Sequence, residues 1–280
     1  MGVNIFPDVR QLLKSVPGSR IIAAVRNPAK AQDLAERGVI VREADYARPE
    51  TLARAFEGVE KLILISSSEV NGRLPLHRAV IDAAKQAGVS LLAYTSMLHA
   101  DSSTAQLAIE HRQTEEAIAA SGLPAVILRN GWYTENHLYA LSAALEHGAF
   151  VGSAKCGRFS SAARKDYAAA AAAAAAVLTK GSHAGEIYEL AADQAFTLAE
   201  LAAEVSRQSG KPVVYNDLPE QDYAKLLVDF GLPADLAALL ADADAAASRG
   251  ALFDDGGVLS TLIGRPSIPM KELVALALRA

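Results

Sequence analysis

The sequence of 280 residues has very little cysteine. Cys156 is the single one, which excludes an intrachain disulfide and a paired-cysteine redox or zinc motif. Residues 1–8 also lack the basic and apolar regions of a signal peptide. These absences favour a reducing cytoplasm as the location of the protein.

Concentrated basic charge and long apolar runs are absent as well. The chain has 27 Lys and Arg against 32 Asp and Glu, and the basic residues form no dense cluster. A nucleic-acid ligand is therefore not expected, since binding phosphates requires clustered positive charge. No uncharged apolar run reaches the ~18 residues that would span a bilayer, so we expect no membrane insertion.

Several catalytic motifs are missing. Tyr-x-x-x-Lys does not occur, which disfavours carbonyl reduction by a tyrosine and lysine pair. A nucleophile elbow of the form G-x-S-x-G and a metal helix of the form H-E-x-x-H are absent, and no metal site is expected. Residues 152–159 share only glycine spacing with a phosphate-binding P-loop, because Arg158 and Phe159 replace its Lys and its Ser or Thr. We interpret this stretch as a flexible loop on the substrate side.

Strand-like and helix-like segments alternate through the first half of the chain. Apolar runs typical of strands occupy residues 21–25, 39–41, 61–65, 91–94 and 125–128. Helical patterns lie next to them at residues 8–15, 29–37, 49–56, 76–87 and 107–120. This alternation predicts an α/β fold with a Rossmann-like, doubly wound parallel sheet. The run 61–65 is expected to be buried on both faces.

The second half is less regular. Alanines at 168–176 predict a helix packed closely on the sheet, because alanine combines high helix propensity with a small side chain. A strand at 186–190, a helix capped by Thr197, a strand at 213–215 and a helix from Pro219 predict a smaller α+β lobe.

These patterns give a two-domain prediction. Residues 1–135 are expected to form the Rossmann-like domain, and residues 136–280 mainly a substrate lobe over the carboxyl ends of the strands. Segments near 160–180 are expected to pack back on the sheet.

Arg26 is the most informative residue. It closes the apolar run 21–25 and opens a turn at Asn27 and Pro28. In dinucleotide-binding folds an acidic residue at this point binds the ribose of NAD, whereas an arginine pairs with the 2′-phosphate of NADP. Arg26 therefore predicts NADP as the cofactor. Lys30 can assist Arg26, although a solvated lysine in the first turns of a helix is the favoured interpretation.

Six short strings occur in a fixed order: VRNPAKA at 25–31, ADY at 44–46, ISSSE at 65–69, YTS at 94–96, HRQTE at 111–115 and LRNGWYTEN at 128–136. Together they resemble the NmrA-like atypical short-chain dehydrogenases, most closely the bacterial NADPH:quinone oxidoreductase branch. The likeness extends over nearly everything after Asp8. It implies an NADPH-dependent oxidoreductase that transfers hydride to a quinone or similar small electrophile. A catalytically weak, NADP-sensing regulator is the alternative, and the possibility of a homo-oligomer stays open.

The resemblance also implies which residues bind the cofactor. They are Arg26 at the adenosine 2′-phosphate, Ser66, Ser67 and Ser68 along the path of the cofactor, and Asn130, Gly131 and Tyr133 near the nicotinamide. Small hydroxyl residues after a strand allow close approach and offer hydrogen bonds, although such serines can simply begin a loop. Asp45 can accept from the adenine amino group, and a structural role in a turn is about equally expected.

Tyr133, Asn130 and His137 are the predicted catalytic residues, because polar and aromatic groups are densest there. Tyr133 can donate to a quinone oxygen or stack on a flat ring. Trp132 is interpreted as a core anchor of the second lobe, and His111 as a structural residue. Hydride transfer to a quinone gives a stabilised anion, which makes a strong protein acid less necessary than for an ordinary ketone.

One part of the family pattern is missing. Members begin with a strand and a loop of the form Thr-Gly-Ala-Thr-Gly-x-x-Gly, whereas this chain has only Gly2 and Gly18 before Arg26. The loop would bind the pyrophosphate, and loss of the strand would expose unpaired edges and apolar faces on its neighbours. Three hypotheses stay open: a truncated or misassigned start, partial replacement by residues 3–6 with altered packing, or a protein that has lost catalysis.

Overall fold

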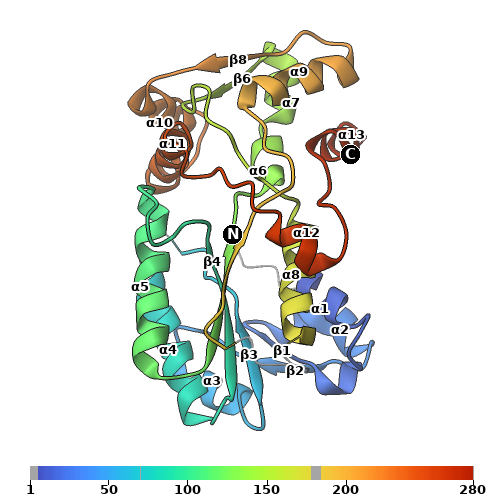
Figure 1. Ribbon diagram of the computed structural model, residues 1–280, viewed down its shortest axis with the longest axis vertical. Coiled ribbons are helices and arrows are strands. Elements are labelled where there is room, and N and C mark those ends of the chain that lie inside the picture. The colour runs from blue at the N-terminus through green and yellow to red at the C-terminus, as the bar shows by residue number, and fades with distance from the viewer. Residues whose placement is uncertain (1–5, 70, 178–183, 280) are drawn as a thin grey trace. The chain divides into compact units, whose positions relative to one another are not determined.

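The structure of the protein is a computed structural model that describes residues 6–69, 71–177 and 184–279 (Figure 1). Its contacts divide the chain into two compact units, each built from separated segments. Unit 1 contains Met1–Ser96, Glu110–Arg129 and Ala168–Tyr188, and unit 2 contains Met97–Ile109, Asn130–Tyr167 and Glu189–Ala280. The sequence predicts two domains with a single boundary at residue 135. In the structure each unit consists of three segments, and the segments of the two units alternate along the chain.

A four-stranded sheet forms the centre of unit 1, although the last residues of three of its strands are assigned to unit 2. The strands lie in the order β3 (Lys61–Leu64), β4 (Leu91–Met97), β5 (Ala125–Asn130) and β7 (Ile187–Leu190). β3 and β4 are parallel. Between β4 and β5 and between β5 and β7, backbone hydrogen bonds keep a constant register offset: Leu92 to Pro124, Leu98 to Asn130, Ile127 to Glu186 and Gly131 to Leu190. A constant offset requires parallel strands, so the predicted doubly wound α/β fold is confirmed.

β7 corrects one expectation. Residues 186–190 are predicted in the smaller lobe, but the strand joins the sheet beside β5. The amide of Ile127 donates to the carbonyl of Glu186, which fixes this pairing. Pairing partners of a short apolar strand are set by the tertiary fold, and its sequence does not encode them.

A separate pair of parallel strands, β1 (Ile22–Val25) and β2 (Ile40–Glu43), completes the strands of unit 1. The helices lying wholly or mostly in this unit are α1 (Phe6–Leu12), α2 (Gln32–Ala35), α3 (Pro49–Ala55), α4 (Arg73–Gln86), α5 (Gln106–Ser121) and α8 (Arg164–Val177), with 3₁₀ turns at Gly18–Arg20 and Pro28–Ala31. The alanine run lies in α8, as predicted, and Ala170 is fully buried.

β1 and β3 are not paired with each other in the described part of the chain. A cavity of about 670 Å³ is lined by both strands, with Ile22, Leu62 and Ile63 among its side chains. The expectation that 61–65 is buried on both faces is therefore wrong: Leu64 is buried, but Leu62 and Ile63 are only half-buried because they line this cavity.

Unit 2 is built around a second small sheet. β6 (Ala149–Gly152) pairs in parallel with β8 (Val214–Asp217). The helices lying wholly in this unit are α6 (Thr134–Leu138), α7 (Leu141–His147), α9 (Leu198–Ser209), α10 (Glu220–Asp229), α11 (Ala234–Ala247), α12 (Val258–Ile263) and α13 (Met270–Ala277). Phe150, Phe159 and Phe196 lie in its apolar core. None of the helices among the described residues is long and apolar enough to cross a membrane.

Local chemistry explains the start of α9. The Thr197 hydroxyl accepts from the amide of Glu200, and the Glu200 carboxylate accepts from the amide of Thr197. This reciprocal capping box satisfies two amides that a helix otherwise leaves unpaired. The predicted cap at Thr197 is confirmed.

The loop after β6 is anchored, which corrects its interpretation as a flexible segment. The amide of Ser153 donates to the Asp244 carboxylate at 3.0 Å, and that of Lys155 donates to Asp217 at 2.7 Å. The amide of Ala154 donates to the Tyr215 hydroxyl at 2.9 Å. Amides that a P-loop would offer to phosphate are thus bonded to acceptors of the protein itself.

Candidate functional site

Arg26 follows the last residue of β1 directly. Its side chain is exposed and has no hydrogen-bond or ion-pair partner in the described part of the chain. The guanidinium acts on Tyr46 nearby: burial raises the pKa of the Tyr46 hydroxyl to about 12, and the charge of Arg26 opposes that rise. An exposed, unpaired cation at the carboxyl end of a parallel strand is available to an anionic ligand.

Asp45 forms part of a turn after β2. Its carboxylate accepts from the amide of Ala47 at 3.0 Å and lies 3.6 Å from the guanidinium of Arg48. Its own amide donates to the Thr51 hydroxyl at 2.9 Å. These contacts support the structural alternative, since a carboxylate accepting from the amide two residues later stabilises a turn. The predicted contact with adenine stays a prediction.

The three serines follow β3 at the edge of the sheet. Ser66 and Ser67 are half-buried, and Ser68 is exposed. The amide of Ser66 donates to the Thr95 hydroxyl at 2.9 Å, which ties the loop to β4. Parallel α/β sheets bind ligands at this carboxyl edge. The role of the three serines along the path of the cofactor stays a prediction.

The buried side chain of His77 is hydrogen-bonded to the serine loop. The amide of Ser67 donates to Nε2 of His77 at 2.9 Å, and Nδ1 of His77 lies 3.0 Å from the Thr114 hydroxyl. Burial and the nearby Arg73 lower the pKa of His77 to about 3, so the ring is neutral. Its unprotonated Nε2 accepts and its Nδ1 donates. Sequence analysis missed this residue, although a polar residue on the apolar face of α4 is a recognisable signal.

Asn130 and Gly131 lie where β5 ends. The carbonyl of Asn130 accepts from the amide of Leu98 at 2.9 Å. Gly131 is closely packed: a Cβ there would lie 2.8 Å from the Tyr167 hydroxyl and 3.2 Å from the carbonyl of Ser160. Only glycine fits without displacing backbone, so this glycine brings β5 close to its neighbours.

Tyr133 packs between two other side chains of unit 2. The guanidinium of Arg164 lies 4.2 Å from the centre of its ring, and the ring of Tyr167 lies 5.3 Å away. These contacts fix the direction of the ring. Its role as a donor stays a prediction. Trp132 packs against the apolar core of unit 2, as its interpretation as an anchor requires.

His137 lies among aromatic rings. Phe159 and Phe196 contact it edge-on at 4.7 and 5.7 Å between ring centres, and its Nε2 lies 3.4 Å from the Ser161 hydroxyl. Burial lowers the pKa of His137 to about 4, which keeps the ring neutral near neutral pH. This environment favours a structural role, and the predicted catalytic role of His137 stays untested.

His111 is buried as well. Its Nδ1 lies 2.8 Å from the hydroxyl of Tyr94, and burial lowers its pKa well below the ordinary value. A histidine that stays neutral and bonded to a buried tyrosine supports the structural interpretation made from the sequence.

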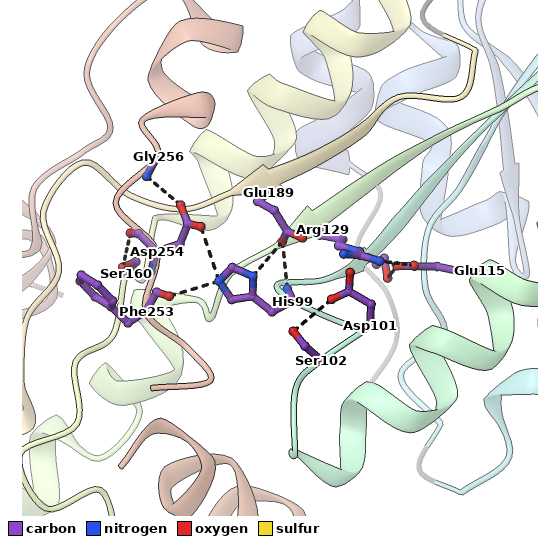
Figure 2. Close-up of polar contacts among 11 residues, drawn as sticks. His99, Asp101, Ser102, Glu115, Arg129, Ser160, Glu189, Phe253, Asp254 and Gly256 are labelled. Carbon is purple, nitrogen blue, oxygen red and sulfur yellow. Dashed lines mark hydrogen bonds and ion pairs between the residues drawn. The ribbon is translucent and has the colours of Figure 1, made fainter. Parts of the chain in front are cut away.

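His99 is a residue that sequence analysis did not single out. It lies two residues after β4 ends, and its ring faces two carboxylates, Glu189 and Asp254 (Figure 2). The signal was available, because His99 follows a buried strand just as Ser66 and Asn130 do. Its carboxylate neighbours come from distant parts of the chain, which no local pattern reveals.

Comparison with known proteins agrees with the geometry of the Rossmann-like sheet. A family model described as NAD(P)H-binding matches residues 9–176. Quinone oxidoreductase 2 of Escherichia coli (strain K12) is 55% identical over 267 residues, which cover 95% of this chain and 92% of that protein.

Solved structures give the same result. The NADPH-dependent quinone oxidoreductase of Escherichia coli in complex with NADPH has a TM-score of 0.94 at 54% identity, covering 97% of this chain and 95% of that one. Triphenylmethane reductase of Citrobacter sp. complexed with NADP(H) has a TM-score of 0.90 at 38% identity, with the same coverage of both chains. The chain therefore belongs to the NAD(P)H-binding, NmrA-like family, as its short sequence strings indicated.

Proposed function

We propose that the protein is an NADPH-dependent oxidoreductase that reduces a quinone or a similar small electrophile. The observation that carries the proposal is Arg26, an exposed and unpaired cation directly after the carboxyl end of β1 in a member of an NAD(P)H-binding family. The curated relative that covers 95% of the chain is a quinone oxidoreductase. The single cysteine, Cys156, is exposed and unpaired, which agrees with a reducing compartment such as the cytoplasm.

The residues present fit NADPH at its 2′-phosphate, for which Arg26 of unit 1 provides the charge. The described residues contain no G-x-G-x-x-G turn for the pyrophosphate, so the fit rests on Arg26. When bound, NADPH supplies the hydride.

Residues of unit 2 orient the quinone and supply the proton that the reduced quinone takes up. Asn130 and Tyr133 offer polar groups near the strand end, and Tyr133 presents a flat ring whose direction is fixed by Arg164 and Tyr167. Reduction of a quinone generates a phenolate-like anion, which needs only a moderate proton donor. The absence of Tyr-x-x-x-Lys is therefore compatible with this reaction.

Turnover assays test the proposal. Purified protein is mixed with NADPH and a panel of simple benzoquinones and naphthoquinones, and NADPH oxidation is followed by its absorbance. We expect quinone-dependent oxidation that is faster with NADPH than with NADH. Calorimetric binding of NADP without turnover of any quinone would overturn the proposal in favour of a sensor, and absence of both would indicate a chain that does not bind the cofactor.

A further inference from the structure

His99 is surrounded by acceptors. Its Nδ1 lies 3.8 Å from a carboxylate oxygen of Glu189, and its Nε2 lies 3.5 Å from a carboxylate oxygen of Asp254 and 3.2 Å from the carbonyl of Phe253 (Figure 2). A neutral imidazole carries one proton and can donate on one side only. Acceptors on both sides therefore match the doubly protonated imidazolium.

Other charged groups of unit 2 also lie near His99. Asp101, two residues further along, accepts from the Ser102 hydroxyl at 3.1 Å. The guanidinium of Arg158 lies over the Phe253 ring, 5.8 Å from its centre.

The backbone holds His99 in an uncommon conformation. Its φ is +52°, in the left-handed region that residues with a side chain rarely adopt. The amide of His99 donates to the Glu189 carboxylate at 2.9 Å, which helps to hold this conformation. Strained residues of this kind concentrate at functional sites, where they fix the direction of a side chain.

His99 also lies beside the end of β5. The preceding residue, Leu98, donates its amide to the carbonyl of Asn130. On the other side, the Ser160 hydroxyl accepts from the amide of Asp254 at 2.9 Å and donates to its carbonyl at 2.7 Å. The carbonyl of Ser160 in turn lies 3.2 Å from where a Cβ on Gly131 would be. The segments that hold His99 are therefore the segments that pack around Asn130 and Gly131.

The His99 ring is partly exposed, and one of its two nitrogens makes no hydrogen bond within the described residues. Its side chain is 28% exposed, unlike the buried ring of His111. Nε2 can donate to the Phe253 carbonyl, whereas Nδ1 makes no hydrogen bond within the described residues. Nδ1–H is thus available to an oxygen of a bound substrate.

We propose that His99 is the proton donor of quinone reduction, with Glu189 and Asp254 orienting its ring. The proposal rests on the proposed function. Addition of hydride, with its electron pair, converts the quinone to a hydroquinone monoanion. The Nδ1–H bond then breaks, an O–H bond forms at the anionic oxygen, and neutral His99 regains a proton from water. The net reaction consumes quinone, NADPH and one proton and gives hydroquinone and NADP⁺.

The direction of proton transfer is favourable. The anion that forms is a phenolate, and phenols are in general much weaker acids than imidazolium.

The test is the replacement His99→Gln, with His147→Gln, an exposed histidine at the end of α7, as the matched control. We expect kcat for quinone reduction to fall at least tenfold in His99→Gln, with Kd for NADPH changed less than twofold. The wild-type rate should decline as pH rises and histidine loses its proton, and this limb should be absent from the pH profile of His99→Gln. Added imidazole should restore part of the lost rate.

A second variant guards against misfolding. Asp254→Asn keeps an oxygen for the amide of Gly256 but removes one charge beside His99. We expect its kcat to fall, because the ring loses one of the carboxylates that orient it. Unchanged kcat and an unchanged pH profile in His99→Gln, or an unchanged kcat in Asp254→Asn, would overturn the assignment. Absence of quinone turnover in the wild-type protein would instead refute the proposed function.

Discussion

Two histidines, His77 in unit 1 and His99 in unit 2, are surrounded in opposite ways. His77 has a donor on one ring nitrogen and a hydroxyl on the other, and burial keeps it neutral with a pKa of about 3. His99 is partly exposed and faces carboxylates on both sides. The same side chain thus serves as a fixed hydrogen-bond bridge in one place and as a candidate proton source in the other.

The difference shows that the neighbours of a histidine decide whether it acts as a fixed hydrogen-bond bridge or can donate a proton. Its place in a helix or after a strand does not decide this. A ring with one donor and one acceptor beside it is fully bonded when neutral. A ring that faces acceptors on both sides can donate on both sides only when it is charged. Replacing these neighbours, or charged residues elsewhere in the two units, should change stability, the pH profile or cofactor affinity by the amounts expected from their surroundings.

The largest effect is expected for the buried ion pair of unit 1. Arg129 and Glu115 form two hydrogen bonds at 3.0 and 2.7 Å, and their side chains are only 5% and 13% exposed. Replacing Glu115 by Gln leaves a buried guanidinium facing a neutral group, and we expect a loss of about 3–5 kcal/mol in the free energy of unfolding. Urea denaturation measures it.

The exposed pair of Arg10 and Asp33 is the control. Both side chains are about half exposed, so Asp33→Asn should cost less than about 1 kcal/mol. Equal losses from Glu115→Gln and Asp33→Asn would show that burial does not distinguish the two pairs.

Removing the bridge at His77 comes next. In His77→Leu the amide of Ser67 loses its acceptor and the Thr114 hydroxyl loses a donor, so we expect about 2–3 kcal/mol lower stability. The pH profile of quinone reduction should keep its shape, in contrast with His99→Gln. Thermal and urea unfolding, with exposed His147→Gln as control, test this. A changed pH profile in His77→Leu would break the comparison between the two histidines.

The charge at Arg26 governs cofactor choice. Arg26→Glu replaces the partner of the 2′-phosphate by a repelling group, so NADPH affinity should fall about 30-fold, equivalent to about 2 kcal/mol. NADH affinity should change much less, and Lys30→Ala should leave both affinities nearly unaltered. Calorimetric titration distinguishes them, and an equal loss for both cofactors would remove Arg26 from the ribose site.

The smallest effect concerns Asp244 in unit 2. Burial, opposed by the hydrogen bond from Ser153 and assisted by the charge of Asp217, raises the pKa of Asp244 to about 7. The folded state therefore binds more protons than the unfolded state between about pH 4 and pH 7, so this group lowers stability as pH rises through that window. Above pH 7 the loss is complete.

Asp244→Asn lacks this titration. We expect the free energy of unfolding of Asp244→Asn, relative to that of the wild type, to be higher at pH 8 than at pH 4.5, because only the wild type loses a proton in this window. The added amide needs a partner and lowers stability equally at both pH values. Denaturation at the two pH values measures the difference, and Asp229→Asn, at an exposed position on α10, is the control. A difference between wild type and Asp244→Asn that does not depend on pH would contradict a raised pKa.

The sheet was predictable because its strands are apolar runs separated by helical patterns, and such runs are stable only when paired and covered. The position of Arg26 directly after a strand was predictable for the same reason, since the end of an apolar run is recognisable in the sequence. The partial exposure of Leu62 and Ile63 was not predictable, because it depends on whether a neighbouring strand covers these side chains.

The sequence by itself determined the alternating α/β pattern, the capping box at Thr197 and the cation after β1, because each depends on residues a few positions apart. Tertiary structure alone decided the partner of β7 and the surroundings of His99. The contacts of His99 with Glu189 and Phe253 span 90 and 154 positions of the chain. Contacts over such separations leave no periodic trace, because they depend on how whole segments pack.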